Sequence, residues 1–428
     1  MGYRAARVSC GFALLFALSS AQAQSGKILT LETALQAANA PHPDIQLAEA
    51  ERDLARADHS LASARRDLNV TLEGRLQGAK STLPGSSFSA DNSVRLNARK
   101  NLYDFGRSVN SIGAARAVSE AREQSLLEAR DQHRIDIMAR FFDVLMADLQ
   151  TTIDGELMTV AFLNFDRGRE SFEQKLLSKV DLSELESRFQ NLLVKRNQSQ
   201  LQQRLTRELL AEAMNQPGQP VADLEDPKLP DNNRALPSYE TLSALIEQSP
   251  GIQGNNKLLE ASRQRLESLR ADNYPTLDAE VEAGEYPDRK LQGRDALRAG
   301  VVLTWPLYQG DRNNAQLARE QAQFHKLQAE TEKLKRNLSQ TVLRLLLEAE
   351  QLQKAARNAA RIQIDARDLA LDRVRAQYEV ELRTNLGETE ALTVEAKLRQ
   401  RANEYQLALT LAKLEAMLGQ PLPKPASK

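Results

Sequence analysis

The strongest constraint on the fold is that the chain contains the same kind of long, proline-free stretch twice. No proline occurs in residues 107–216, a run of 110 residues, or in residues 307–420, a run of 114 residues. The runs end on related segments, EAMNQP at 212–217 and EAMLGQP at 415–421. Another matching pair, Asp166-Arg167 and Asp372-Arg373, is offset by 206 residues. Because solenoid repeats are only about 20 to 50 residues long, this period predicts one duplication of a large unit.

Residues 1–23 have the three parts of a secretory signal peptide. Arg4 and Arg7 precede an apolar run from Val8 to Leu18, and small residues follow up to Ala23. The run is too short to span a bilayer, and a buried N-terminal helix is the alternative interpretation. The chain has one cysteine, Cys10, which lies in this segment. We therefore expect an exported protein without disulfide, zinc-thiolate or cysteine-nucleophile chemistry.

The charge balance excludes a nucleic-acid partner. The chain has 57 basic and 58 acidic residues, a net charge of −1, and removal of Arg4 and Arg7 changes this to 55 − 58 = −3. Such a balance offers no basic surface for phosphates. No later stretch approaches eighteen apolar residues, so we expect no transmembrane helix, whereas membrane strands give a much weaker hydropathy signal.

Four short segments alternate apolar and polar residues, which predicts strands with two distinct faces. The apolar faces are rich in Ala, Gly and Val, and no other globular segment is available to cover them. This favours a lipid-facing wall with a polar interior over a sheet that packs on a soluble core. Four strands cannot close, and open edges in hydrocarbon would leave backbone groups unsatisfied, so we expect copies of the chain to share one barrel. The charged residues on the predicted lumen face are Glu73, Arg75, Arg95, Arg99, Asp278, Glu280, Glu282 and Arg298.

The rest of each half predicts long coiled-coil helices. Apolar residues recur every three or four positions, as in Ile135, Met138 and Phe142 and again in Leu338, Val342 and Leu345. At 1.5 Å per residue, a helix over 107–174 is about 100 Å long, far more than a bilayer's thickness. We therefore expect these helices to project away from the membrane.

The predicted organisation consists of a signal peptide, two repeats, a linker and a tail. The first repeat, 24–216, has helix 44–66, strands 68–79 and 93–103, and helices 107–174 and 181–214. The linker is 217–237 and the tail is 421–428. The second repeat, 238–420, has helix 251–272, strands 274–286 and 296–308, and helices 310–380 and 386–418.

Nearly the whole predicted mature chain resembles the TolC-type outer-membrane efflux or secretion channels, the outer membrane efflux proteins. The motifs that carry the resemblance are LTLETAL at 29–35, the strand-to-helix corners LYDFGR at 102–107 and PLYQG at 306–310, and Gln377-Tyr378 at a helical tip. The resemblance implies a mainly α-helical fold with a membrane β-barrel. Three copies would form a twelve-stranded barrel in the outer membrane of a Gram-negative cell, above a periplasmic α-helical tunnel.

The resemblance also implies a function and partners. The chain would be the channel of a tripartite efflux or type I secretion system, a passive conduit that opens at its periplasmic tips. Its partners would be two further copies, outer-membrane lipid, a periplasmic adaptor protein, and an inner-membrane pump that is an ATP-binding exporter or proton-driven. By similarity the gate residues are Asp181, Tyr378, Arg383 and Glu390. Where the family often has an acidic residue, this chain has Gly387, with Glu388 beside it.

Two helical tips are the expected docking sites for the adaptor. Family tips usually carry glycine before a Leu-x-Ser/Thr segment, but this chain has Lys175 and Glu381 there. Their presence predicts either a different helix cap or a contact between the two side chains. The docking residues implied by the resemblance are Lys175, Leu176, Leu177, Ser178, Glu381, Leu382 and Thr384.

Two other classes of protein were considered. The four histidines are scattered without metal-ligand spacing, and no nucleophile or phosphate-loop motif occurs, so we expect no enzyme, metal or cofactor. A periplasmic adaptor also joins strands to a helical hairpin. It uses a single hairpin between soluble domains, however, whereas this chain predicts two hairpins and barrel-type strands.

Overall fold

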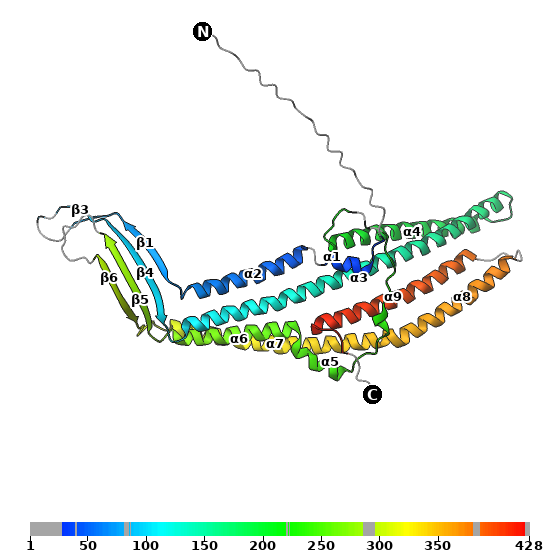
Figure 1. The fold of residues 1–428 in the computed structure, drawn as a ribbon. Coiled ribbons are helices and arrows are strands. Elements are labelled where there is room, and N and C mark those ends of the chain that lie inside the picture. The colour runs from blue at the N-terminus through cyan, green and yellow to red at the C-terminus, as the bar shows by residue number, and fades with distance from the viewer. Residues whose placement is uncertain are drawn as a thin grey trace, which may run out of the picture.

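The computed structural model describes residues 28–38, 41–80, 85, 87–219, 221, 223–285, 296–379 and 386–423. A sheet lies at one end of the molecule and a column of long helices extends from it (Figure 1). The expected signal peptide lies outside the described residues. Within them, none of the helices has an apolar stretch of the length that crossing a bilayer requires.

The main sheet is antiparallel and contains one hairpin from each repeat. Its strand order is β1 (Asn69–Arg75), β4 (Ser93–Tyr103), β5 (Thr276–Glu285) and β6 (Leu297–Thr304). Strands β4 and β5 pair across the two repeats, which leaves β1 and β6 at the edges. Two of the strands end well before the expected residue. The segment expected as 68–79 is divided, because β2 (Gly78–Ala79) pairs separately with β3 (Ser89–Ala90). The strand expected to reach residue 308 ends at Thr304, because Pro306 has no amide to donate to a ladder.

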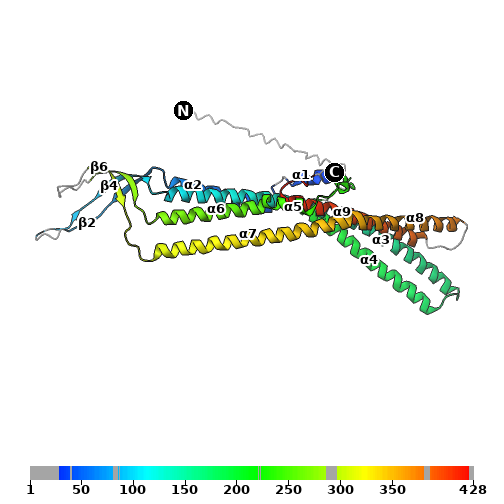
Figure 2. The same ribbon diagram turned by 90° about the horizontal axis from the view of Figure 1, so that it is seen from below.

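Next to the sheet, four helices lie side by side. Contacts give the order α2 (Pro43–Ala64), α3 (Arg107–Glu173), α6 (Pro250–Ala271) and α7 (Arg312–Gln351). In the far half the order is α4 (Lys179–Ala213), α3, α9 (Leu386–Leu418) and α8 (Arg357–Glu379). Figure 2 shows the two coils, α3 with α4 and α8 with α9, diverging toward the far end. Every layer therefore has one edge from the first repeat and one from the second.

The core lies in the middle of the column, where short helices meet end to end. One cluster packs Phe141 and Val144 of α3 against Leu210 of α4 and against α1 (Leu31–Ala37). The other packs α5 (Tyr239–Leu245) and α6 against α7 and α9. Neither α1 nor α5 was predicted from the sequence.

The duplicated motifs are the helix ends that meet at this core. Asn215 and Gly419 both have a left-handed conformation, with φ of 57° and 68°. In each case the next amide donates to a carbonyl five residues back, at 2.8 Å after α4 and 3.3 Å after α9, which is a Schellman cap. His42-Pro43 and Ser249-Pro250 begin α2 and α6, with the His or Ser side chain accepting a backbone hydrogen bond as N-cap. The recurring residues therefore define where one helix stops and the next begins.

The single helix expected over 310–380 is interrupted by a π-helical turn, Leu352–Ala356, between α7 and α8. The equivalent part of α3 remains α-helical. The linker explains the difference, because Gln353 within the π turn donates hydrogen bonds to the carbonyls of Asn232, at 3.0 Å, and Arg234, at 2.7 Å. The wider π turn directs the Gln353 side chain toward the linker, whereas a regular α-helix would direct it elsewhere.

Candidate functional site

The strand register places all eight predicted lumen residues on one face of the sheet. Glu73 lies opposite Arg95 on β4, and Arg99 lies opposite Glu280 on β5. Residues two apart on a strand share a face, so the remaining members follow from these pairs. The sequence alternation therefore placed these side chains correctly relative to one another.

Ion pairs tie this polar face together near the helices. The guanidinium of Arg99 lies 2.7 Å from the carboxylate of Asp278 and 3.4 Å from that of Glu280. Asn101 donates a second hydrogen bond to Asp278 at 3.0 Å. Asp278 is only 4% exposed, so both of its oxygens are satisfied where water is scarce. A groove of about 620 Å³, lined in part by these residues, runs along this side of the sheet.

The polar face is balanced in charge. Glu73 contacts Arg75 at 2.9 Å and Arg95 at 3.4 Å. Glu282 lies directly opposite Arg298 in the register of β5 and β6. The eight residues comprise four acids and four bases, so the face carries no net charge. Such a surface attracts neither cations nor anions as a class.

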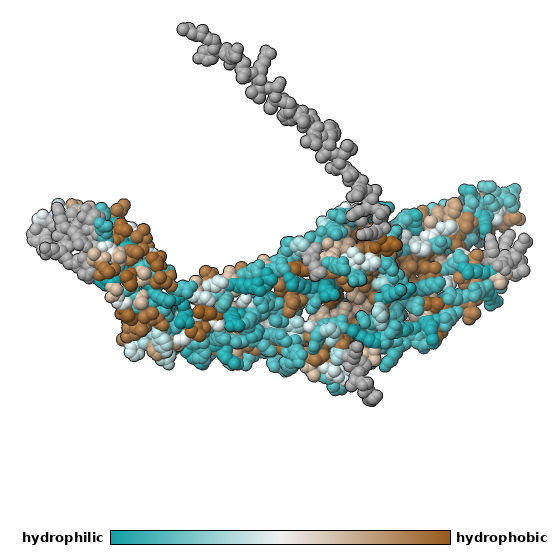
Figure 3. All heavy atoms as spheres, viewed as in Figure 1, coloured by the Kyte–Doolittle hydropathy of each residue, from teal (hydrophilic) through white to brown (hydrophobic). Residues whose placement is uncertain are grey.

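The other face of the sheet is apolar and exposed. Leu72 of β1 is 72% exposed, and Leu297, Val301 and Leu303 of β6 are 60 to 67% exposed. Figure 3 shows apolar residues gathered over the strands, whereas the surface of the adjoining helices is mainly hydrophilic. A continuous exposed apolar patch marks a surface that is covered by a partner or by lipid.

The first helical tip connects α3 to α4 through a lysine with positive φ. Lys175 has φ of 60°, and its amide donates to the Phe172 carbonyl while the Leu176 amide donates to the Ser171 carbonyl, both at 2.8 Å. This is the Schellman cap that glycine usually provides, so the lysine adopts a conformation that costs a side chain about 1 kcal/mol. The expectation of a different cap is therefore wrong at this tip, because the lysine itself adopts the left-handed conformation, and the alternative contact with Glu381 lies outside the described residues.

The predicted gate residue Asp181 lies in the first turn of α4. Its backbone amide donates to the Ser178 hydroxyl at 3.1 Å, and that hydroxyl is 2.7 Å from the Asp181 carboxylate. Ser178 is thus the N-cap of α4, while Leu176 is 76% exposed and Leu177 is half-buried.

At the second tip the structure describes only part of the predicted set. Tyr378 lies in the last turn of α8. Its side chain, and Glu381, Leu382, Arg383 and Thr384, lie outside the described residues. Glu390 of α9 pairs with Arg375 of α8 at 3.4 Å. The proposed bonds among Asp181, Tyr378 and Arg383 therefore remain predictions.

A polar network that the sequence did not reveal fixes the linker to α9. Arg357, just after the π turn, donates two hydrogen bonds of 2.7 Å to Glu404. Asn232 of the linker is buried and donates to the same carboxylate at 2.8 Å. Burial alone raises the pKa of Glu404, but the bonds from Arg357 and Asn232 outweigh it and lower the pKa overall. The linker is thereby attached to the second coil.

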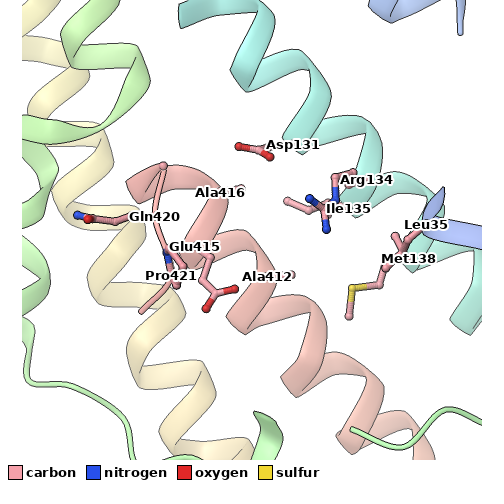
Figure 4. A pocket seen from close by; sticks show the side chains of 11 residues that line it. Leu35, Asp131, Arg134, Ile135, Met138, Ala412, Glu415, Ala416, Gln420 and Pro421 are labelled. Atoms are coloured by element: carbon pink, nitrogen blue, oxygen red, sulfur yellow. The ribbon is translucent and has the colours of Figure 1, made fainter. Parts of the chain in front are cut away.

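A cavity of about 280 Å³ lies between α1, α3 and the end of α9. Figure 4 shows side chains of α3 and of the α9 terminus on opposite sides of it. Burial raises the pKa of Asp131, and neighbouring Arg134 opposes that shift. Glu415 across the cavity contacts Arg234 of the linker at 2.8 Å. Among the described residues, no group of His, Cys, Asp and Glu is arranged to hold a metal ion.

Comparisons with known proteins point to one class. Residues 241–420 match the family described as "Outer membrane efflux protein". No curated protein matches the chain. Among solved structures, the outer membrane protein VceC from Vibrio cholerae is 16% identical with a TM-score of 0.72, covering 92% of this chain and 97% of VceC. The CmeC outer membrane channel of Campylobacter jejuni is 13% identical with a TM-score of 0.75, covering 93% and 87%. The Neisseria gonorrhoeae MtrE outer membrane channel, in its open state, is 19% identical with a TM-score of 0.71, covering 93% and 91%.

A duplicated chain that joins a two-faced antiparallel sheet to a column of stacked helices has the fold of the solved outer-membrane channels VceC and CmeC. The match and the shared fold agree with the resemblance read from the sequence. The second repeat thus matches the outer membrane efflux protein family, and the chain as a whole shares its fold with solved outer-membrane channels. The family consists of transport conduits rather than enzymes. The fold supports the channel over the periplasmic adaptor considered as the alternative.

Proposed function

We propose that this chain is the outer-membrane channel of a tripartite efflux or type I secretion system, a passive conduit across the periplasm and the outer membrane. The observation that carries the proposal is the arrangement of edges. The edge elements are β1 and β6 in the sheet, α2 and α7 in the near helices, and α4 and α8 in the far helices. In every layer the first repeat supplies one edge and the second repeat supplies the other.

Edges of this kind are completed by further copies. If β1 pairs with β6 of a neighbouring copy, the same rotation places α2 beside a neighbouring α7 and α4 beside a neighbouring α8. Such a head-to-tail contact generates a closed ring. Closure satisfies the unpaired strand edges, which would each cost several kcal/mol in hydrocarbon. The family resemblance sets the number of copies at three.

The edge helices have surfaces that fit this contact. On α2, Leu47, Leu54 and Leu61 are 64 to 65% exposed and seven residues apart, so they form one stripe, here called the α2 leucine stripe. On α7, exposed alanines recur with the same spacing at 315, 322 and 329. The two helices run in opposite directions relative to the sheet (Figure 1). Large side chains on one helix and small ones on the other allow close packing between neighbours.

In the ring, the polar face of the sheet lines the pore and the apolar face contacts lipid. The balanced charges of the lining favour a conduit with little preference for either sign of ion. Asp181, Tyr378, Arg383 and Glu390 would close the pore at the helical tips. Charge-assisted bonds suit this role because they are strong when formed and are exchangeable for water.

The tips are also the proposed docking sites for the periplasmic adaptor and, through it, for an ATP-binding exporter or a proton-driven pump. The residues assigned to docking are Lys175, Leu176, Leu177, Ser178, Glu381, Leu382 and Thr384. The exposure of Leu176 and the Schellman turn at Lys175 support a projecting apolar contact at the first tip.

Two measurements on detergent-purified protein test the proposal. We expect a heat-sensitive trimer in gel electrophoresis and discrete conductance steps in planar bilayers. A single water-soluble copy that leaves the bilayer silent would contradict the channel and favour the adaptor.

A further inference from the structure

The two coils of one protomer make a close contact between the start of α9 and the body of α3, at a glycine. A Cβ atom built on Gly387, at the start of α9, would lie 2.4 Å from Cγ2 of Val160 on α3. Ordinary carbon–carbon contacts are about 3.5 to 4.0 Å. Valine has one strongly preferred rotamer in a helix, so its methyl cannot turn aside cheaply. Any side chain at residue 387 therefore requires the coils to move apart by about 1 Å or more.

An ion pair joins the same two coils one residue further along α9. The guanidinium of Arg188 on α4 lies 3.2 Å from the carboxylate of Glu388. The pair is partly exposed, and such pairs stabilise a contact only weakly when they act alone. Here the glycine contact brings the coils together, and the ion pair adds an attraction that depends on the sign of both charges.

We propose that Val160, Gly387, Arg188 and Glu388 form a closing contact, here called the tip contact, that sets how far the tip of the channel is open. This inference rests on the proposed channel function. It adds four positioning residues to the gate, none of which was assigned to it from the sequence. In this arrangement Gly387 is required because it is small, so that an acidic side chain at this position would hold the tip open.

The contact links the repeats rather than the helices of one hairpin. Val160 and Arg188 belong to the first coil, whereas Gly387 and Glu388 belong to the second. The neighbouring pair, Arg375 with Glu390, lies within the second coil and therefore does not restrain its separation from the first. Separation of the coils breaks the tip contact and leaves the packing inside each coil intact.

The test is single-channel conductance of the purified full-length protein in planar bilayers. Gly387→Ala and Gly387→Asp should each raise the conductance several-fold. Adding Val160→Ala to Gly387→Ala should restore the wild-type value, because it leaves the new Cβ at 3.8 Å from the Cβ of residue 160. Gly155→Ala is the matched control: Gly155 also lies in α3, but a Cβ there meets nothing within 4 Å, so conductance should not change.

Charge exchange tests the ion pair separately. Arg188→Glu and Glu388→Arg should each raise the conductance, and the double exchange should return it toward wild type. Heat-sensitive trimer migration of every variant confirms assembly. Wild-type conductance in Gly387→Asp, or failure of Val160→Ala to compensate Gly387→Ala, would overturn the tip contact while leaving the channel in place. A wild-type protein that forms no pore would overturn the proposed function and this inference with it.

Discussion

The α2 leucine stripe offers the sharpest test of ring closure, through the substitution Leu54→Glu. Complete burial of a leucine contributes about 1.5 to 3 kcal/mol, and Leu54 is 65% exposed in a single copy. Its burial against a neighbour is therefore worth about 1 to 2 kcal/mol per interface. A carboxylate at this position adds a desolvation cost, so Leu54→Glu should weaken the free energy of association by at least about 2 kcal/mol per interface. Three interfaces multiply this to about 6 kcal/mol, roughly four powers of ten in the assembly constant.

The assay is light scattering coupled to size-exclusion chromatography in detergent, over a dilution series. Wild type should remain trimeric at concentrations where Leu54→Glu dissociates. Ser60→Glu introduces the same charge on an exposed position of α2 outside the stripe, and should behave as wild type. A Leu54→Glu variant that stays trimeric at every dilution would refute the pairing of α2 with α7.

Three further predictions concern the helix ends and the buried histidine. Gly419→Ala should lower the free energy of unfolding by about 2 to 4 kcal/mol, because residue 419 has φ of 68° and its Cβ would lie 2.6 Å from the rigid ring of Pro250. The control Gly218→Ala also has a left-handed conformation, with φ of 74°, but its Cβ meets no other atom, so thermal melts should show a loss of only about 1 kcal/mol. Lys175→Gly should relieve the left-handed lysine and slow hydrogen exchange at the first tip about fivefold, which a comparison of deuterium uptake would detect. Burial and the stacked ring of His42, at 4.2 Å, lower the pKa of His133, with Asp44 and Asp136 opposing. The folded state therefore binds this proton more weakly than the unfolded chain, so stability should be complete above about pH 6.5 and decline on acidification. His133→Phe should show a flatter dependence of melting temperature between pH 7.5 and 5.5.

The strand alternation explains why the shared polar face of the eight charged residues could be predicted from the sequence. A period of two fixes the face of every side chain once the strands exist, and the hairpins then fix the register. Glu73 and Arg95, or Arg99 and Glu280, thus lie opposite each other without further information. The resemblance supplied the family, and the match over residues 241–420 and the fold shared with solved outer-membrane channels agree with it.

The tip contact and the linker network could not be predicted in this way. Gly387 was noted only as an unexpected residue, because its role depends on Val160, which is 227 residues away in the sequence. The π turn likewise depends on Asn232 and Arg234 of the linker, and nothing in the periodicity of 310–380 signals it. Contacts between distant segments require the packing of the two repeats to be known.

The π turn makes the two halves of an otherwise duplicated molecule mechanically unequal. A continuous rod such as α3 resists bending along its whole length, whereas a helix with one wide turn has a weak point at a defined height. In an assembly of three copies, stiff and jointed coils would alternate around the axis. The aperture would then have threefold rather than sixfold symmetry, because the three coils that contain α3 would stay in place while the three coils that contain α8 would move.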